Sequence, residues 1–216
     1  MADADPEALA DVGYGIFEHL LNKGLREQGK NLSVLVEQGT GFRKEFDGIF
    51  SRFAGEYPQL AEALAQRFPD LTTIYTMILS GEGVTPSKTT QMYWIVQDAP
   101  DSSPEAIEDE KAGKWLIFLE PDQVDVSWKK VRDATVEGTL GISTKVSTAK
   151  PNLESRDNRK VIYVYTKDWA DEADVMRVRQ KLKDLGFVDR IGYKRNIETF
   201  AGEYAKKGKR VTYYSA

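Results

Sequence analysis

Apolar residues return at helical spacing through the first third of the chain. Between Pro6 and Leu79, a spacing of three or four positions appears in LADVGYGIFEHLLNKGL, in GFRKEFDGIFSRF and in YPQLAEALAQRF, where Pro58 suits a first turn. The segment DLTTIYTMILSG is rich in β-branched residues and fits either a helix or a strand. We predict an all-helical region over residues 1–80, in which the repeated aromatic residues form a core rather than a ligand site.

The pattern changes after a polar segment. Residues 81–90 (GEGVTPSKTT) combine Gly, Pro, Ser and Thr, which is typical of a linker. Two amphipathic helices follow, EPDQVDVSWKKVRDATVEG and DEADVMRVRQKLKDLG, and each ends at a Gly. We predict a second domain over residues 91–216. Its short apolar runs typical of strands are 91–97, 114–119, 139–147, 160–166, 190–195 and 210–214.

The strand predicted at 139–147 alternates between two kinds of side chain. Leu140, Ile142 and Val146 point one way, whereas Lys145 points the other way with its Gly and Ser neighbours. Strands that interleave with two helices, yet include hairpin-like neighbours, indicate an α+β domain with helices on one face of a sheet. The other face, which carries Lys145, is then free to be polar.

Composition limits the chemistry that the chain can perform. Cysteine is absent and the only histidine is His19, which excludes disulfides, thiol catalysis and Cys-based or multi-His metal sites. A Ser-His-Asp triad would need His19 as its base. No Walker A loop, G-x-G-x-x-G motif or H-E-x-x-H motif occurs. Asp109 and Glu110 have oxygens that suit magnesium, but adjacent loop acids are usually solvated, so we expect no metal and no cofactor.

No feature of the sequence directs the chain to a membrane. No apolar run approaches the roughly 18 residues that a membrane span requires. The acidic start, MADADPEALADVG, lacks the basic and apolar regions of a signal peptide. We therefore expect a cytoplasmic protein with no membrane partner.

Charge divides the chain into an acidic and a basic half. Residues 1–113 carry 9 Lys and Arg against 19 Asp and Glu, a net charge of −10, whereas residues 114–216 carry 21 against 15, a net charge of +6. In the basic half, Lys145, Lys150 and Lys194 lie in or beside predicted strands and are interleaved with Tyr and Trp. Such residues suit a phosphate-bearing ligand or RNA. Mutual neutralisation of the two halves, or a solvated charged surface, explains them equally well.

Several segments of the second domain stand in the order found in the cap-binding translation initiation factor 4E family. They are IEDEKAGKWLIF, VSWKKV, GISTK, KVIYVYTKD, EADVMRVRQKLKDLGF and IGYKR. Over roughly residues 91–214 the chain resembles that family. It is also similar to the family named after a basophilic leukaemia-expressed protein, which bears a phosphothreonine lyase domain label. The resemblance implies a strongly curved, mainly antiparallel sheet of eight strands, backed by helices.

The resemblance also implies roles for individual residues. In the factor 4E family two Trp rings stack a methylated base, a Glu reads the base edge and basic side chains hold the phosphates. Glu108 stands where that Glu is expected, and Lys145 stands where a phosphate-binding Arg is expected, with Lys150 as a second phosphate contact. Trp94 would supply one stacking ring. Ile107 replaces the other Trp and has no π-face for a cationic base.

Three hypotheses follow for the function. The first is a non-enzymatic protein that binds a phosphorylated ligand, a nucleotide or an RNA 5′ end, on the concave face of the sheet. Its expected binding residues are Trp94, Glu108, Lys145, Lys150 and Lys194. The second is a phosphothreonine-lyase-like enzyme with a Lys as base, although the general acid of that family resembles a His and only His19 is available. The third is a protein-interaction scaffold that binds a protein partner through the N-terminal helices.

Overall fold

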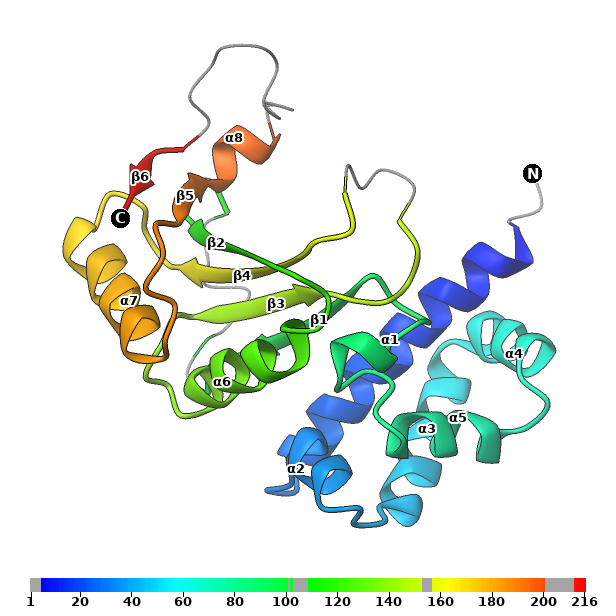
Figure 1. Cartoon of the computed structure of the whole chain (residues 1–216). Coiled ribbons are helices and arrows are strands. Elements are labelled where there is room, and N and C mark those ends of the chain that lie inside the picture. Colours follow the sequence, from blue (N-terminus) through cyan, green and yellow to red (C-terminus); the bar gives the residue numbers. More distant parts are fainter. Residues whose placement is uncertain (1–4, 101, 103–108, 153–156, 201–211) are drawn as a thin grey trace. The chain divides into compact units, whose positions relative to one another are not determined.

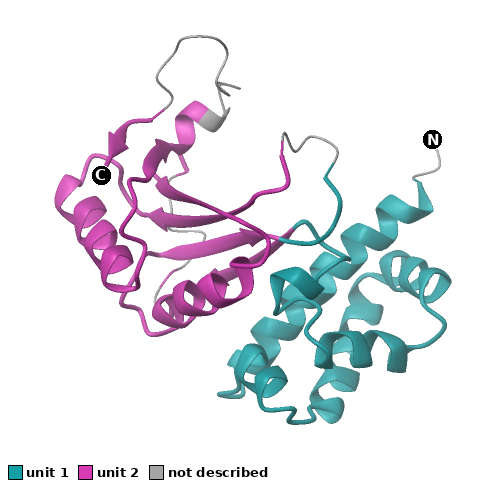
Figure 2. Cartoon of the chain, in the orientation of Figure 1, with its two compact units in different colours: residues 1–93, 148–153 teal, residues 94–147, 154–216 magenta. Residues whose placement is uncertain are grey.

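The computed structural model describes residues 5–100, 102, 109–152, 157–200 and 212–216. Figure 2 shows that the chain divides into two compact units. The first, the helical unit, comprises residues 1–93 and 148–153, and the second, the sheet unit, comprises residues 94–147 and 154–216. The domain boundaries that we expected near residues 80 and 91 stay a prediction.

The helical unit begins with consecutive α-helices, as the spacing of apolar residues predicted. They are α1 Pro6–Arg26, α2 Leu32–Glu37, α3 Arg43–Glu56, α4 Pro58–Arg67 and α5 Leu71–Leu79, followed by the 3₁₀ turn η1 Pro86–Lys88. The ambiguous segment is therefore a helix. Asp70 caps it by accepting a hydrogen bond from the backbone N–H of Thr73 at 2.7 Å. Among the residues that the structure describes, no helix is long and apolar enough to cross a membrane.

Phenylalanine side chains form the core of the helical unit. Phe17 of α1 lies edge-on to Phe46 and Phe50 of α3, at centroid distances of 5.2 and 5.1 Å. Phe53 lies 5.6 Å from the same ring. Phe17, Phe46 and Phe53 are fully buried. The aromatic residues that recur at helical spacing are thus a packed core, as predicted.

Residues 81–90, which we expected to form a linker, are held within the helical unit by hydrogen bonds. The carboxylate of Glu82 accepts hydrogen bonds from the backbone N–H groups of Thr90 and Gln91, at 2.9 and 3.1 Å. Glu82 is only 4% exposed. A buried carboxylate needs such donors to offset its lost hydration, so this segment has a defined position in the unit.

The sheet unit contains an antiparallel sheet of six strands in its described residues (Figure 1). The strands are β1 Trp94–Asp98, β2 Gly113–Leu119, β3 Ser143–Ser147, β4 Lys160–Thr166, β5 Gly192–Arg195 and β6 Tyr214–Ser215. They pair in the order β1-β3-β4-β2-β5-β6. The helices of this unit are α6 Val124–Val136, α7 Glu172–Asp184 and α8 Asn196–Phe200. The α+β class predicted from the sequence is confirmed.

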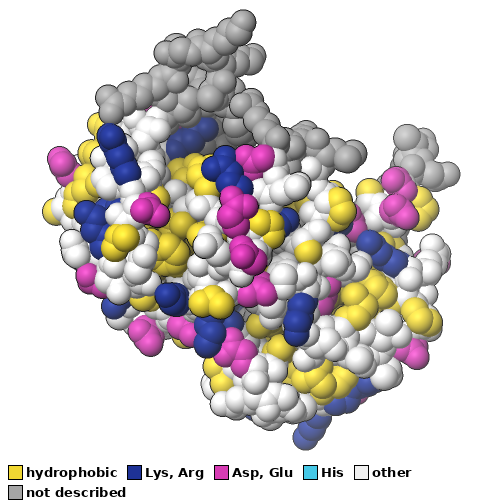
Figure 3. Space-filling view, in the orientation of Figure 1, with side chains coloured by type: hydrophobic (Ala, Val, Ile, Leu, Met, Phe, Trp, Pro, Cys, Tyr) yellow, Lys and Arg dark blue, Asp and Glu magenta, His cyan; other side chains and the backbone are white. Residues whose placement is uncertain are grey.

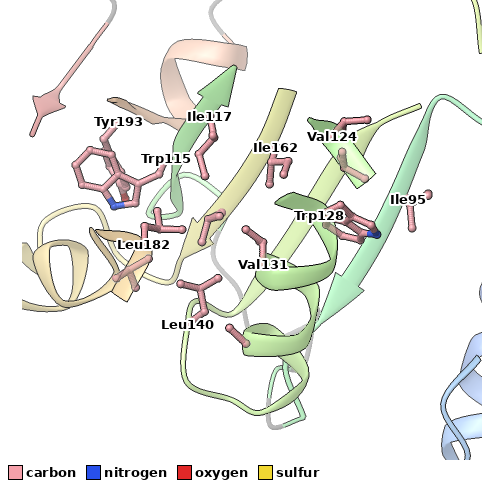
Figure 4. Close-up of a cluster of buried hydrophobic side chains, with 14 of the residues drawn as sticks. Ile95, Trp115, Ile117, Val124, Trp128, Val131, Leu140, Ile162, Leu182 and Tyr193 are labelled. Carbon is pink, nitrogen blue, oxygen red and sulfur yellow. The ribbon is translucent and has the colours of Figure 1, made fainter. Parts of the chain in front are cut away.

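Helices α6 and α7 cover one face of the sheet, and the core lies between them and the strands (Figure 4). Trp115 of β2 and Trp128 of α6 are almost completely buried in this core. The indole N–H of Trp115 donates a hydrogen bond to the carbonyl of Val175 in α7 at 3.1 Å, which satisfies its polar atom inside an apolar environment. The helices therefore lie on one face, as the sequence predicted.

The expected strong curvature is absent from the described sheet. The family resemblance implied eight strongly curved strands, whereas the structure describes six that do not curl strongly (Figure 1). Strand twist accumulates along and across the strands of a sheet. The outer strands β5 and β6 contain only four and two residues, so they offer little length over which coiling can build up.

Gly113 leaves the space that Tyr193 fills, so we predict that Gly113→Ala destabilises the sheet unit. A Cβ at Gly113 would lie 2.1 Å from the hydroxyl oxygen of Tyr193. That buried hydroxyl is hydrogen-bonded to the Thr166 hydroxyl at 2.6 Å, so the ring cannot move without losing the bond. Overpacking of this kind costs about 1–3 kcal/mol, which urea unfolding would measure.

Gly48→Ala is the matched control for that substitution. A Cβ at Gly48, in α3, would meet no atom within 4 Å. This control should be neutral or stabilise the chain by about 0.5–1 kcal/mol, because Ala favours a helix over Gly. Equal unfolding midpoints for Gly113→Ala and the parent chain would contradict the prediction, because they would show that the packing of Tyr193 tolerates a Cβ at position 113.

Candidate functional site

The sheet face opposite α6 and α7 carries three lysines. Lys145 points to this face because its neighbours Thr144 and Val146 are buried on the helix-covered face. The same alternation places Lys114 of β2 and Lys194 of β5 here, where they are direct cross-strand partners. We call Lys114, Lys145 and Lys194 the lysine cluster.

Three aromatic side chains lie on the same face. They are Trp94 of β1 and Tyr163 and Tyr165 of β4, which we call the aromatic set. Lys145 is the cross-strand partner of Tyr163, and Lys114 is the cross-strand partner of Tyr165. The pairing of four strands therefore brings the two sets together from distant parts of the sequence.

The ammonium group of Lys145 lies over all three rings of the aromatic set. Its Nζ is 4.4 Å from the ring centroid of Trp94, 5.2 Å from that of Tyr163 and 5.9 Å from that of Tyr165. Trp94 and Tyr163 also stack on each other, at 5.3 Å with an interplanar angle of 28°. Ring faces attract a cation at these distances. Burial lowers the pKa of Lys145, and in the described part of the chain no carboxylate pairs with it.

Lys114 is held more deeply in the sheet than Lys145. Its Nζ donates a hydrogen bond to Oδ1 of Asn196 at 2.9 Å and lies 5.6 and 5.4 Å from the ring centroids of Tyr163 and Tyr165. Lys114 is 6% exposed and Lys194 is 9% exposed. Burial, and then the positive charges of the other two lysines, lower the pKa of Lys114 to about 8. A fraction of this amine is therefore neutral near physiological pH.

The hydroxyl of Tyr165 remains protonated at neutral pH. Burial raises the pKa of Tyr165, and Tyr163 and Asp109 raise it further. Asp109 belongs to the acidic stretch that precedes β2, so one carboxylate of this stretch contributes to the electrostatics of Tyr165. Among the described residues, no group of three His, Asp or Glu side chains has the arrangement that a metal ion requires.

The predicted site residues fall into three groups. The structure brings Trp94, Lys145 and Lys194 onto one face of the sheet. Lys150 belongs to the helical unit, where its Nζ forms an ion pair with Asp11 and donates to a backbone carbonyl at 3.1 Å. Glu108 lies outside the described residues. The binding roles of all five residues stay predictions.

Sequence reasoning missed Lys114, Tyr163 and Tyr165. The run KVIYVYT is nearly continuous in apolar character, which is typical of a central strand and hides the alternation of its two sides. Strict alternation within it would have placed both tyrosines opposite Ile162 and Val164, which are fully buried. The same alternation along GKWLIFL places Lys114 on the opposite side of the strand from Trp115 and Ile117, which are buried.

Charge alone does not identify a site on this molecule. Figure 3 shows basic and acidic side chains interspersed over the described surface that it draws. A hollow of about 820 Å³ lies in the helical unit along α5, but it gathers two carboxylates, Asp70 and Glu82, with a single cation, Lys88. The lysine cluster is different because three cations share one sheet face with aromatic rings.

Part of the chain matches a known protein family. Residues 107–201 match the model of the family described as basophilic leukemia-expressed protein Bles03. This segment includes β2 to β5 and therefore Lys114, Lys145 and Lys194, whereas Trp94 precedes it. The likeness to this family that the sequence indicated is confirmed for the matched residues.

Two solved structures are similar to part of the chain. One is Ascaris suum eIF4E-3 in complex with m2,2,7G cap, at 16% identity over 56% of this chain and 68% of that one, with a TM-score of 0.39. The other is C. elegans eIF4E-3 with the 4E-binding protein Mextli, at 14% identity over 46% of this chain and 62% of that one, with a TM-score of 0.36. The cap and Mextli are bound by those two proteins.

The pKa of Lys114 generates a prediction about its reactivity. Competitive labelling with an amine-acylating reagent, read by peptide mass spectrometry, should give a reactivity midpoint near pH 8 for Lys114. The exposed Lys183 of α7 is the reference for the efficiency of labelling. Lys145→Gln should move the Lys114 midpoint upward, because it removes a like charge. A Lys114 midpoint at the usual lysine value of about 10.4 in the unsubstituted chain would contradict the cluster geometry.

Proposed function

We propose that the chain is a non-enzymatic binding protein for a phosphorylated ligand, a nucleotide or an RNA 5′ end, on the helix-free face of the sheet. The observation that carries this proposal is the lysine cluster, in which three largely buried cations share one face with the aromatic set. Of the three function classes considered, this one explains why the cations converge.

The electrostatics of the cluster favour an anionic ligand. Like charges directly across a strand pair destabilise a sheet, and Lys114 and Lys194 are such partners. Burial adds a desolvation cost that lowers the pKa of Lys114 and of Lys145. A phosphate group carries up to two negative charges and several acceptor oxygens, so it would offset both costs. Perturbed pKa values of this origin are common at functional sites.

Each predicted residue has a place in this proposal. Lys145 and Lys114 would hold the phosphate, with Lys194 beside them. Glu108 would contact a base edge, and Trp94 would lie at the border of the site. Lys150, the second phosphate contact that the resemblance implies, forms its ion pair with Asp11 within the helical unit.

A charge-reversal variant tests the proposed site. Lys145→Glu should weaken binding of GTP and of a short 5′-phosphorylated RNA at least tenfold, because a charge-assisted hydrogen bond contributes about 1.5–3 kcal/mol and the new carboxylate repels phosphate. Tryptophan-fluorescence titration at two salt concentrations would measure the affinities. Binding to the parent chain should also weaken with salt.

The control for this titration is Lys183→Glu, at an exposed position of α7 on the covered side of the sheet. It changes the net charge equally and should leave the affinity within about twofold, since separated surface charges are screened. Equal affinities for Lys145→Glu and Lys183→Glu would refute the site.

The neutral fraction of Lys114 favours one second candidate, a phosphothreonine-lyase-like enzyme. Its amine would take the α-proton of phosphothreonine as phosphate leaves from the β-carbon. His19, the only histidine, is exposed on α1 of the helical unit and is no member of the lysine cluster. Incubation with a phosphothreonine peptide should leave its mass unchanged under the binding proposal. Loss of phosphoric acid that disappears in Lys114→Met would establish the enzyme instead.

A further inference from the structure

The aromatic set already holds a cation that belongs to the protein. Lys145 Nζ lies within 6 Å of three ring centroids, and the closest approach, 4.4 Å, is to Trp94. This is the distance range in which ring faces bind ammonium groups. The rings that would otherwise hold a positively charged base are therefore occupied by a side chain of the same sheet.

Trp94 also contacts a second aromatic ring of the same face. It stacks on Tyr163 at 5.3 Å, so one of its neighbours is a ring of the protein itself. The family pattern places Ile107 where a second stacking Trp is expected, and an aliphatic side chain cannot replace it. A base that stacked on these rings would meet the Lys145 ammonium and the Trp94–Tyr163 stack.

We propose that Trp94, Tyr163 and Tyr165 position the Lys145 ammonium for phosphate, so that the site takes anionic ligands and rejects a cationic, methylated base. This inference rests on the proposed function and specifies its ligand class. The three rings fix the position of the ammonium, and its N–H groups would then donate hydrogen bonds to the phosphate. Lys114 lies over the same two tyrosine rings, so a second cation reinforces the selection.

Two consequences separate this inference from ordinary base stacking. A methylated, positively charged base placed on these rings would meet the Lys145 ammonium at close range, and the repulsion should weaken binding about tenfold. Loss of a ring should also weaken the binding of a ligand that has no base, because the ring affects the ligand only by positioning Lys145. Stacking on a base predicts the opposite in both respects.

Isothermal titration calorimetry of the full chain tests the inference with inorganic tripolyphosphate, GTP and 7-methyl-GTP. GTP should bind about tenfold more tightly than 7-methyl-GTP. Trp94→Leu should weaken tripolyphosphate and GTP by the same factor, about three- to tenfold. Lys145→Met should weaken GTP and abolish the preference against the methylated base. Circular dichroism would verify that both variants fold, and the comparison of ligands on the parent chain needs no variant.

The other outcomes overturn the inference in distinguishable ways. Equal or tighter binding of 7-methyl-GTP by the parent chain would overturn the inference and leave the proposed function standing. If Trp94→Leu weakened the binding of GTP but not of tripolyphosphate, the inference would also be overturned, because the ring would then contact the base. The proposed function would still stand. Absence of binding by all three ligands would overturn both the inference and the proposed function.

Discussion

Burial of one sheet face beneath α6 and α7 is the constraint from which the site follows. Side chains alternate along a strand, so the burial of Trp115 and Ile117 obliges Lys114 to emerge on the opposite face. The hydrogen bond from Trp115 to the Val175 carbonyl ties β2 to α7 and so helps to define the register. A slip by one residue would place the Lys114 ammonium in the apolar core, at a cost of several kcal/mol.

That register places like-charged, partly buried lysines close together on the helix-free face, and the aromatic set offsets part of the repulsion. Lys114 and Lys145 are both within 6 Å of the rings of Tyr163 and Tyr165, which attract cations without adding negative charge. The relief is incomplete, because the pKa of both lysines stays below the usual value. Among the described carboxylates, Glu198 opposes part of this shift at Lys114. The cost that remains gives the face a reason to bind an anion.

The helical unit shows the contrasting use of a lysine. Lys150 lies only five positions after Lys145, yet it forms an ion pair with Asp11, which also pairs with Arg67, and its Nζ is 4.6 Å from the ring centroid of Tyr93. The two basic groups hold the pKa of Asp11 below its ordinary value against the opposing effect of burial. Here a carboxylate pairs with the cation, and these contacts hold Lys150 within the helical unit. Lys145 and Lys150 carry the same charge, but of the two only Lys150 pairs with a carboxylate among the described residues.

By itself, the sequence determined the elements and their class. Helical spacing identified the N-terminal helices, and alternation at 139–147 identified β3 with Lys145 on its polar side, because local periodicity reports which side of an element is buried. It did not determine the number or curvature of the strands, the membership of Lys114, Tyr163 and Tyr165 in one site, or the pairing of Lys150 with Asp11. Only the tertiary structure decided these points. Strand order and register join residues 94 to 195 that are distant in the chain, and those pairings depend on the packing of the whole sheet.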